Sequence, residues 1–341
     1  MPVSKSHKAK PPAASEQALD VFFYEAFQEE EEALRCALER TGIRAGFSKG
    51  AIQELDAGQP KAPLISIRTQ SLIPEDWAGR ISGILTRSTG YDHVLGYRRR
   101  TGNDVPCGYL PLYCNRAVAE HAMLLWMALM RKLPRQIEHF QSFNRDGLTG
   151  VESCGKVLLV VGVGHIGSEV ARIGQGLGMR VRGVDVVKRY PDVDYVTLGE
   201  GLADADVIVC AMSLTTTNRG FFSHARLKGL RPGTIFVNVA RGELSPSIDL
   251  LRLLDDGVLG GVGLDVFDHE IDLASTLRSA KPVCDPETKA ALELARRDNV
   301  ILTPHNAFNT AEAVERKALH SIRQIERFIA QGDFLWSVPL E

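Results

Sequence analysis

Short apolar runs alternate with segments of helical spacing along most of the chain. In the first half, a Glu-rich segment with helical spacing at 27–41 follows an aromatic run, and the segments at 51–57 and 74–80 have the character of helices or turns. Strands that alternate with helices predict a parallel sheet with right-handed crossover connections. The predicted strands of this half are Asp20–Ala26, Ile43–Phe47, Leu64–Thr69 and Ile81–Thr86.

A second series of the same kind begins at Lys156. Helical stretches at 167–177 and 246–256 separate its apolar runs, and a final helix is predicted at 311–331. Because 341 residues are too many for one comfortable core, we expect an α/β protein with two doubly wound parallel-sheet domains. The predicted strands of the second sheet are Val157–Val161, Arg180–Val184, Val207–Ala211, Thr234–Val239, Gly261–Val266 and Val300–Leu302.

The stretch Ala117–Leu133 between the two series predicts a long helix that is apolar almost all round. Asn115 is the expected N-cap, and Pro134 is expected to end the helix. A helix without a polar face is predicted to be buried between domains or subunits. We therefore expect a homodimer formed through this region, since two-fold symmetry dominates among soluble oligomers.

Composition narrows the class of protein. Apolar residues make up 44% and charged residues 24% of the chain, and the net charge of −2 gives no reason to expect a nucleic acid or a membrane as partner. The longest apolar stretch, Ala122–Met130, is far shorter than the ~20 residues of a membrane span. Residues 1–18 are rich in Lys, Pro and Ala where a secretory leader would be apolar, so we expect a flexible tail.

The six cysteines form no C-x-x-C pair, and none lies beside a His at metal-ligand spacing. We therefore expect no metal site. Scattered free cysteines favour a reducing compartment, so the predicted location is the cytoplasm.

A glycine motif at the start of the second series indicates a dinucleotide site. The predicted strand Val157–Val161 runs directly into Gly162-Val163-Gly164-His165-Ile166-Gly167, and a helix follows. In such a G-x-G-x-x-G turn the first glycine permits the bend, the second lets the backbone approach a pyrophosphate, and the third lets helix and strand pack closely. Asp185 ends the next strand, where its carboxylate would hold the adenosine ribose hydroxyls and repel a 2′-phosphate. The motif predicts a Rossmann-like domain that prefers NAD to NADP, although Lys188 and Arg189 lie close enough to weaken that preference.

Three further segments place chemistry at the ends of predicted strands. Arg241 follows the strand that ends at Val239, Glu270 follows the one that ends at Val266, and His305 follows the last strand. In an open α/β sheet, ligands bind outside the carboxyl ends of the strands. Each of these side chains alone is more often a surface or core residue, but together they can converge on one crevice.

These segments resemble the D-isomer-specific 2-hydroxyacid dehydrogenase family over roughly residues 20–340, and most closely its D-lactate dehydrogenase-type members. The order and spacing of the motifs are more specific than the glycine turn alone, which many dinucleotide-binding proteins share. The resemblance rests on Gly162–Gly167, Asp185, the VNVARGE stretch, GLDVF with Glu270, TPH with Ala307, and AVAEH at 117–121.

The resemblance implies a hydride transfer between NAD(H) and a small 2-oxo or D-2-hydroxy acid. Arg241 corresponds to the arginine that grips the substrate carboxylate and polarises the oxo group, a task that suits its planar fork. His305 corresponds to the general acid that protonates the carbonyl oxygen, and Glu270 to the carboxylate that partners it. The family usually places Pro after this Glu, and here Ile271 stands there, beside the crowded turn of Asp268 and His269.

The same resemblance implies a substrate loop and a pocket wall. Thr89 and Gly90 lie in a loop after a strand of the first domain, and they match the turn whose backbone N–H groups bind the substrate carboxylate. Tyr113 and Phe308 match residues that line the pocket in lactate-type members. The cofactor contacts implied by position are Gly162, Gly164, His165, Ile166, Gly167, Asp185, Met212, Ser213, Asn218, Ala240 and Asp265.

The resemblance also implies the domain division and leaves three alternatives. We expect a flexible tail at 1–18, a discontinuous substrate domain at 19–114 plus 304–341, and an NAD-binding domain at 115–303. Phosphite dehydrogenases have Lys where Thr89 stands, which argues against that reaction. Pyruvate or a close analogue is the favoured substrate, a glyoxylate or hydroxypyruvate reductase is the enzyme alternative, and an NAD-sensing corepressor-like protein is an alternative of another class.

Overall fold

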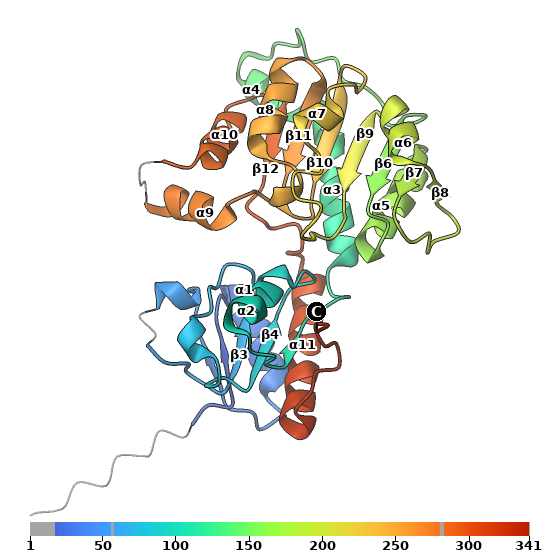
Figure 1. Cartoon of the computed structure of the whole chain (residues 1–341). Helices are drawn as coiled ribbons and strands as arrows, with labels where there is room; N and C mark the ends of the chain where they lie inside the picture. Colours follow the sequence, from blue (N-terminus) through green and yellow to red (C-terminus); the bar gives the residue numbers. More distant parts are fainter. Residues whose placement is uncertain (1–17, 56–57, 280–282, 341) are drawn as a thin grey trace, which may run out of the picture.

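A computed structural model describes residues 18–55, 58–279 and 283–340, so nearly all of the predicted tail at 1–18 lies outside the described residues. Two parallel sheets form the cores of two lobes (Figure 1). The smaller sheet has the strand order β2-β1-β3-β4-β5. Every neighbouring pair in it is parallel. Its strands are β1 Val21–Phe23, β2 Ala45–Phe47, β3 Leu64–Ile67, β4 Gly83–Thr86 and β5 Cys107–Gly108.

The larger sheet has seven parallel strands in the order β12-β11-β10-β9-β6-β7-β8. The chain winds from β6 toward β7 and β8, and then returns to build β9 to β12 on the other side. The strand order reverses between β6 and β9, and α/β proteins bind ligands at the carboxyl ends of the strands at such a reversal. These strands are β6 Val157–Val161, β7 Arg180–Val184, β8 Asp194–Tyr195, β9 Val207–Cys210, β10 Thr234–Asn238, β11 Leu259–Leu264 and β12 Val300–Leu302.

Helices connect and cover both sheets, and the prediction of two doubly wound parallel sheets is confirmed. Single turns of 3-10 helix occupy two of the segments expected to be helical, Ile52–Glu54 and Glu75–Trp77. The helices are α1 Gln28–Leu38, α2 Asp92–Thr101, α3 Asn115–Met130, α4 Leu133–His139, α5 His165–Gly176, α6 Leu198–Asp204, α7 His224–Leu227, α8 Ser247–Asp255, α9 Glu270–Ser279, α10 Pro286–Leu294 and α11 Ala311–Gln331.

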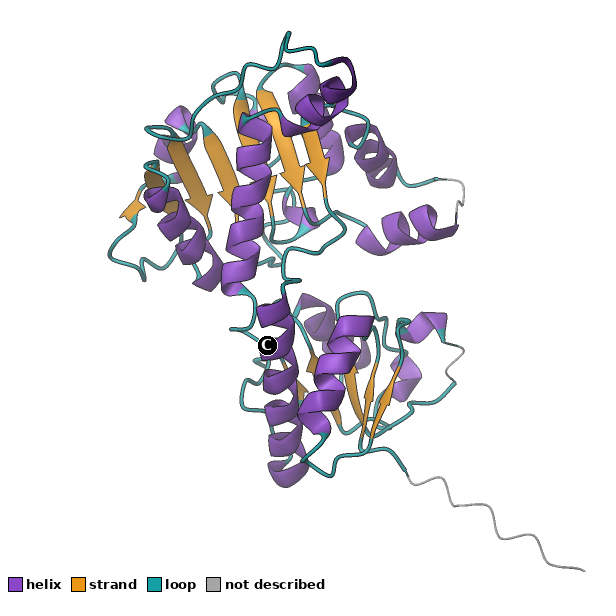
Figure 2. Ribbon diagram, turned by 180° about the vertical axis from the view of Figure 1, so that it is seen from behind, coloured by secondary structure: helices purple, strands orange, loops and turns teal. Residues whose placement is uncertain are grey.

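Helix α3 lies across one face of the larger sheet (Figure 2). Gly261 and Gly263 of β11 let Leu125 and Leu129 of the helix lie directly on the strand, because a Cβ at either glycine would touch those side chains. The apolar surface of α3 is therefore largely covered within this chain. Two predictions about its ends are wrong: Cys114, not Asn115, precedes the first turn, and Pro134 lies in the first turn of α4. Proline suits that place because the first residues of a helix need no N–H donor.

The chain crosses between the two sheets twice. It leaves the smaller sheet after β5 to form α3 on the larger one, and it returns after β12 so that α11 packs against α1 (Figure 1). Helix α11 has the bounds predicted for it, and its Ala318, Ile322 and Ile325 are buried in the core. Among the described residues, no helix is long and apolar enough to cross a membrane.

Candidate active site

The glycine turn between β6 and α5 has the geometry that its motif requires. Gly162 has a φ of +92°, and a Cβ there would lie 2.4 Å from the Met212 backbone. A Cβ at Gly167 would lie 1.9 Å from the carbonyl oxygen of Gly162. Gly164, by contrast, faces open space at the N-terminus of α5. A side chain at the first or third glycine would collide with neighbouring backbone, so the fold itself requires glycine there. The second glycine leaves room for a phosphate group on the free N–H groups of the helix.

Asp185 stands beside this turn at the end of β7. Its Oδ2 accepts the N–H of Val163 at 2.6 Å, and its Oδ1 accepts the N–H of Val187 at 2.9 Å. The carboxylate therefore fixes the glycine turn while the residue stays half-exposed. At the first turn of α5, His165 is exposed, with its Nδ1 3.4 Å from the Tyr190 hydroxyl, and Ile166 is half-buried. The residues present fit a dinucleotide with its pyrophosphate on α5.

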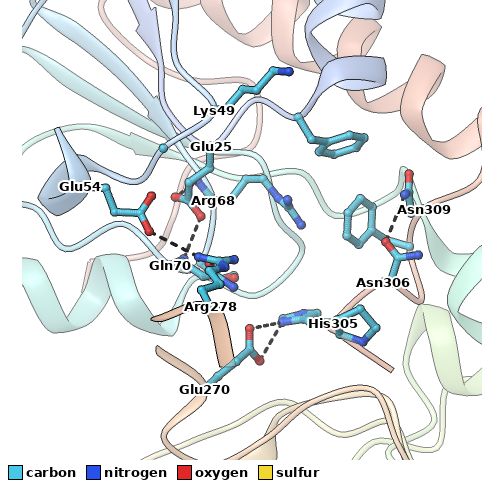
Figure 3. Close-up of a pocket in the computed structure, with 15 residues that line it drawn as sticks. Glu25, Lys49, Glu54, Arg68, Gln70, Glu270, Arg278, His305, Asn306 and Asn309 are labelled. Carbon is cyan, nitrogen blue, oxygen red and sulfur yellow. Dashed lines mark hydrogen bonds and ion pairs between the residues drawn. The ribbon is translucent and has the colours of Figure 1, made fainter. Parts of the chain in front are cut away.

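His305 and Glu270 form the central ion pair of the site. The Nδ1 atom of His305 lies 2.8 and 2.9 Å from the two oxygens of Glu270 (Figure 3). Burial raises the pKa of Glu270, but the hydrogen bond and charge of His305, together with the charge of Arg241, outweigh burial and hold that pKa below its usual value. The carboxylate is therefore an anion at neutral pH, and it leaves Nε2 of His305 as the ring atom for other chemistry.

The acidic turn before α9 separates its three polar side chains. His269 has a φ of +53°, and its Nδ1 lies 2.9 Å from Asp285. Its Nε2 lies 3.8 Å from Asp268. Glu270 alone in this turn contacts His305, so the crowding seen in the sequence is resolved by the outward pairing of His269.

Asp265 is a buried carboxylate that holds the loop carrying His305. Its Oδ1 accepts the hydroxyl of Thr303 at 2.6 Å and the N–H of Asn306 at 2.8 Å, and its Oδ2 accepts the N–H of Ala307 at 2.8 Å. His305 itself has a φ of +51°, a conformation that side chains other than glycine adopt only when their surroundings impose it. The bonds to Asp265 supply that constraint from the neighbouring strand.

Arg241 reaches from the end of β10 to the loop after β4. Its Nε donates to Asp92 at 3.0 Å, and its Nη1 donates to the carbonyl of Ala240 at 2.9 Å. Its Nη2 is buried and has no acceptor among the described residues. A Cβ at Gly90 would lie 1.6 Å from this Nη2, so the guanidinium rests on the glycine backbone. One donor of the fork is thus left free at the loop predicted to bind a carboxylate.

The segment from Thr86, the last residue of β4, to His93, in the first turn of α2, is held by its own side chains. The Thr86 hydroxyl lies 2.7 Å from that of Ser88, which in turn donates to the Gly90 carbonyl at 2.6 Å. The Thr89 hydroxyl donates to the Leu110 carbonyl at 3.2 Å and therefore points away from Arg241. Burial lowers the pKa of His93 to about 4, so this ring is neutral. Because the His93 ring carries no charge, recognition of an anion by this rigid segment would depend on its backbone N–H groups.

Two adjoining cavities meet at the ion pair. A cavity of about 590 Å³ is lined by Arg68, Glu270, His305 and Phe308 among others (Figure 3). A second, of about 480 Å³, is lined by Asp92, Arg241, Glu270 and His305. The fold therefore places Arg241, Glu270 and His305 around one cavity, and Gly90 lies against Arg241.

The remaining predicted contacts lie in two groups. Phe308 lines the larger cavity, whereas Tyr113 is buried behind it, with ring centroids 6.3 Å apart. Asn218 donates to the Ser213 carbonyl at 2.9 Å and closes the loop after β9, in which Met212 is half-buried. The N–H of Ala240 donates to Oδ1 of Asn238 at 2.9 Å. Contacts from Tyr113, Met212, Ser213, Asn218 and Ala240 to a ligand stay predictions.

Sequence reasoning missed three residues of this site. Asp92 orients Arg241, Asn238 is fully buried and donates to the Arg241 carbonyl at 2.8 Å, and Arg68 lines the larger cavity. Asn238 lies in the VNVARGE stretch, so a polar residue inside an apolar strand was the available signal. Asp92 and Arg68 lie on the other sheet, and no local pattern links them to Arg241 or His305.

Comparison with known proteins agrees with this geometry. The model of the D-isomer-specific 2-hydroxyacid dehydrogenase NAD-binding domain matches residues 123–307. The chain is 32% identical to the D-lactate dehydrogenase of Escherichia coli over 72% of this chain and 76% of that protein. The chain belongs to the D-isomer-specific 2-hydroxyacid dehydrogenase family.

Two further proteins are similar to this dehydrogenase, one in structure and one in sequence. The structure of Aquifex aeolicus D-lactate dehydrogenase, complexed with NAD and lactic acid, has a TM-score of 0.81 and 29% identity, and covers 93% of this chain and 99% of that one. A glyoxylate reductase of Pyrococcus furiosus is 29% identical over 71% of this chain and 70% of that protein. The protein is an NAD-dependent enzyme that interconverts hydroxy and oxo acids, as the sequence predicts.

Proposed function

We propose that the enzyme reduces pyruvate, or a 2-oxo acid of similar size, to the D-2-hydroxy acid. The observation that carries this proposal is the free Nη2 of Arg241, a buried donor that lacks an acceptor beside the His305–Glu270 pair. A buried donor without an acceptor costs about 1–3 kcal/mol, so a ligand oxygen at this point is favoured. The D configuration of the product rests on family membership.

In this mechanism each polar group has one task. The backbone N–H groups of Thr89 and Gly90 and the free Nη2 of Arg241 bind the substrate carboxylate and polarise the oxo group. His305 donates the proton on Nε2 to the carbonyl oxygen, and Glu270 stabilises the charged ring before that step. NAD, when bound as NADH, supplies the hydride. Phe308, with Tyr113 behind it, forms the wall for the side chain of the substrate.

We assign the cofactor to the crevice beside the glycine turn. Asp185 favours NAD over NADP because its carboxylate accepts ribose hydroxyls and repels a 2′-phosphate. The open space at Gly164 supports this placement. The proposed contacts are Gly162, Gly164, His165, Ile166, Gly167, Asp185, Met212, Ser213, Asn218, Ala240 and Asp265.

A substrate panel tests the proposal. Pyruvate, glyoxylate, hydroxypyruvate and branched 2-oxo acids would each be offered with NADH and with NADPH. Turnover of about 1–10³ s⁻¹ on pyruvate with NADH is expected. A higher kcat/KM for glyoxylate or hydroxypyruvate would favour the second candidate, which the likeness to the Pyrococcus furiosus enzyme supports. Absence of turnover on every acid, with NADH bound, would contradict the proposal.

We further propose a cytoplasmic homodimer whose partners are small acids and a second copy of the chain, with no nucleic acid or membrane. We also propose a division into a substrate domain at 19–114 plus 304–341 and an NAD-binding domain at 115–303. Large apolar side chains beside α3 support the dimer: Leu133, Ile137 and Phe140 are 41%, 66% and 73% exposed. Sedimentation of the Ile137→Lys, Phe140→Glu double variant is expected to show monomers, while a monomeric parent protein would contradict the dimer.

A further inference from the structure

The histidine of the AVAEH stretch, His121, has no task in the mechanism proposed above. It lies in the second turn of α3, is half-buried, and lines neither of the two cavities at the ion pair. Its Nε2 lies 3.0 Å from the Thr303 hydroxyl and 3.7 Å from Oδ1 of Asp265. The ring therefore meets the buried carboxylate that holds the loop of His305, and it can act on that loop from behind.

The packing of α3 on β11 fixes where this side chain stands. Successive turns of the helix, at Leu129 and Leu125, lie on the two glycines of β11, which are two residues apart. Four residues of a helix rise about 6.0 Å and two residues of a strand about 6.6 Å, so each turn of α3 matches two residues of β11. The next step in the same direction places His121 beside Asp265, the residue that follows β11.

The hydrogen bonds around Thr303 fix which nitrogen of His121 carries a proton. Both oxygens of Asp265 accept backbone N–H groups, as those of a carboxylate do, so the proton in its 2.6 Å contact with Thr303 comes from the hydroxyl. A hydroxyl has a single proton to donate, and its approach to the Leu264 carbonyl is much longer, at 3.4 Å. Toward His121 the hydroxyl oxygen is therefore an acceptor, and Nε2 of His121 is the donor.

These bonds form a chain that runs from α3 to the loop of His305. His121 donates to Thr303, which donates to Asp265. The same carboxylate accepts the N–H groups of the two residues after His305. His305 has a φ of +51°, a conformation that persists only where neighbouring bonds impose it. Helix α3 and the segment after β12 are also the two parts of the chain that cross between the sheets, so the chain of bonds joins both crossings beside His305.

We propose that His121 is a positioning residue, which holds His305 where the proton on its Nε2 reaches the carbonyl oxygen of the 2-oxo acid. The inference rests on the proposed function, because His121 acts through the proton donor. The substrate carboxylate is assigned to Arg241 and the turn at Gly90, which His121 does not touch. Loss of the ring should therefore lower kcat and leave KM nearly unchanged.

Two amides of different length test this role. The amide nitrogen of glutamine lies as many bonds from Cβ as Nε2 of histidine does, whereas that of asparagine is one bond closer. With NADH and the 2-oxo acid that the parent enzyme reduces fastest, His121→Leu and His121→Asn should each lower kcat by roughly tenfold or more, with KM within about twofold, because a small misplacement of a reacting group is costly. His121→Gln should stay within about threefold of the parent kcat, since it keeps a donor at Thr303.

A solvent isotope effect distinguishes a displaced proton donor from a protein that is merely less well folded. In His121→Leu the ratio of kcat in H2O to kcat in D2O is expected to rise above that of the parent enzyme, because proton transfer becomes slower relative to the other steps. A smaller fraction of folded enzyme would lower kcat and leave this ratio unchanged. An unchanged ratio together with a lowered kcat would therefore contradict the positioning role.

Thr303→Val breaks the same chain at its second member. The double variant His121→Leu, Thr303→Val is expected to be no slower than Thr303→Val alone, because both substitutions remove one set of coupled bonds. Thr303→Ser keeps the hydroxyl and should retain most of the activity. Losses that multiply in the double variant would show that His121 acts by another route, and would overturn the chain.

His320→Leu provides the matched control. His320 is also a half-buried histidine of a long helix, α11, but its ring packs against Trp336, with centroids 5.0 Å apart, and it lines neither cavity. Its kcat and its isotope ratio are expected to equal those of the parent enzyme. The melting temperature and the affinity for NADH would be compared in all variants, so that a folding defect is recognised.

The outcomes separate this inference from the proposed function. If the parent enzyme reduces no 2-oxo acid, the proposed function is wrong. If it does, and His121→Leu keeps the parent kcat, the function stands and the role of His121 is wrong. The direction of the bonds is also measurable without turnover or any variant. In the 15N NMR spectrum of the parent protein the His121 ring should have a proton on Nε2, and an unprotonated Nε2 would overturn the chain.

Discussion

The two sheets meet at the site with different kinds of group. From the larger sheet come side chains that follow β10, β11 and β12, namely Arg241, Glu270 and His305. From the smaller sheet come a loop with backbone N–H groups around Gly90, the carboxylate of Asp92, and the Arg68 guanidinium. In the proposed mechanism the larger sheet therefore supplies the groups that move a proton, and the smaller one supplies groups that bind and orient the acid.

We therefore expect substitutions after the strands of the larger sheet and substitutions in the loops of the smaller sheet to have different effects on the kinetics. A change on the larger sheet should lower the rate for every substrate alike. A change on the smaller sheet should alter affinity, or the choice among substrates. Five substitutions test this division, beginning with the largest expected effect.

His305→Ala removes the proposed proton donor. We expect kcat for pyruvate reduction to fall by about 10²–10⁴-fold, the contribution typical of general acid catalysis. NADH titration by fluorescence should give an unchanged affinity, because the glycine turn lies on other loops. Near-full activity of this variant would remove His305 from the mechanism and with it the contrast between the two edges.

Arg241→Lys replaces the fork with a single ammonium group. A lysine cannot contact Asp92 and still present a second donor in a fixed plane. Loss of a hydrogen bond to a charged group costs about 1.5–3 kcal/mol, so kcat/KM should fall by roughly 10- to 150-fold. Steady-state kinetics with unchanged kcat and KM would contradict the role of the fork.

Gly90→Ala tests the smaller sheet at the point where the two edges touch. The new Cβ would lie 1.6 Å from Nη2 of Arg241, so the guanidinium must move. We expect a loss in kcat/KM of roughly tenfold or more, because a small misplacement of a positioning group is costly. Gly58→Ala, in an exposed loop of the same lobe where a Cβ would meet nothing within 4 Å, is the control for stability, with a melting temperature measured for both. Activity equal to that of the parent enzyme would show that Arg241 does not depend on this glycine.

Glu270→Gln tests the charge behind the imidazole. Burial raises the pKa of Glu270, but His305 and Arg241 outweigh burial and hold it below its usual value, so the carboxylate is ionised through the neutral range. The amide keeps an oxygen acceptor for Nδ1 of His305 but no charge, so kcat/KM for pyruvate reduction in steady-state assays at neutral pH is expected to fall by roughly tenfold, since a charge-assisted hydrogen bond becomes a neutral one. Equal kcat/KM in Glu270→Gln and the parent enzyme would show that the charge of Glu270 is not needed.

Thr89→Ala should have the smallest effect. Its hydroxyl bonds the Leu110 carbonyl, and only its backbone N–H is assigned to the substrate. We expect kcat/KM to stay within about threefold and the melting temperature to fall by a few degrees, since one neutral hydrogen bond contributes about 0.5–1.5 kcal/mol. A large rise in KM would mean that the side chain, and not the backbone, recognises the acid.

The strands of the larger sheet and the groups at their ends could be predicted because their signals are local. The run from Val157 to Gly167 contains strand, turn and helix signals in one stretch, and α11 has uninterrupted helical spacing. Strands β5 and β8 have two residues each, too few for any periodicity to be recognised.

Contacts that join distant segments could not be predicted. Asp92 and Arg241 are 149 positions apart, and only the folded chain shows that they pair. Arg68 follows an apolar strand, as many surface arginines do. Only the folded chain shows that its guanidinium lies over the ring of Phe308, which comes from the other end of the sequence. Pro134 was misinterpreted because a proline can mark the start of a new helix as well as the end of an old one.

The two crossings of the chain between the sheets also constrain how the cavities can open. The two segments that cross between the sheets lie close together (Figure 1). Rotation of one lobe about the line that joins these segments is therefore the relative motion that strains the chain least. Translation or twisting would stretch one connection or bend α3 and α11, which are continuous helices anchored in opposite lobes. Rotation about this line would separate Arg278 of the larger lobe from Glu54 of the smaller one, so this contact is expected to open and close with the lobes.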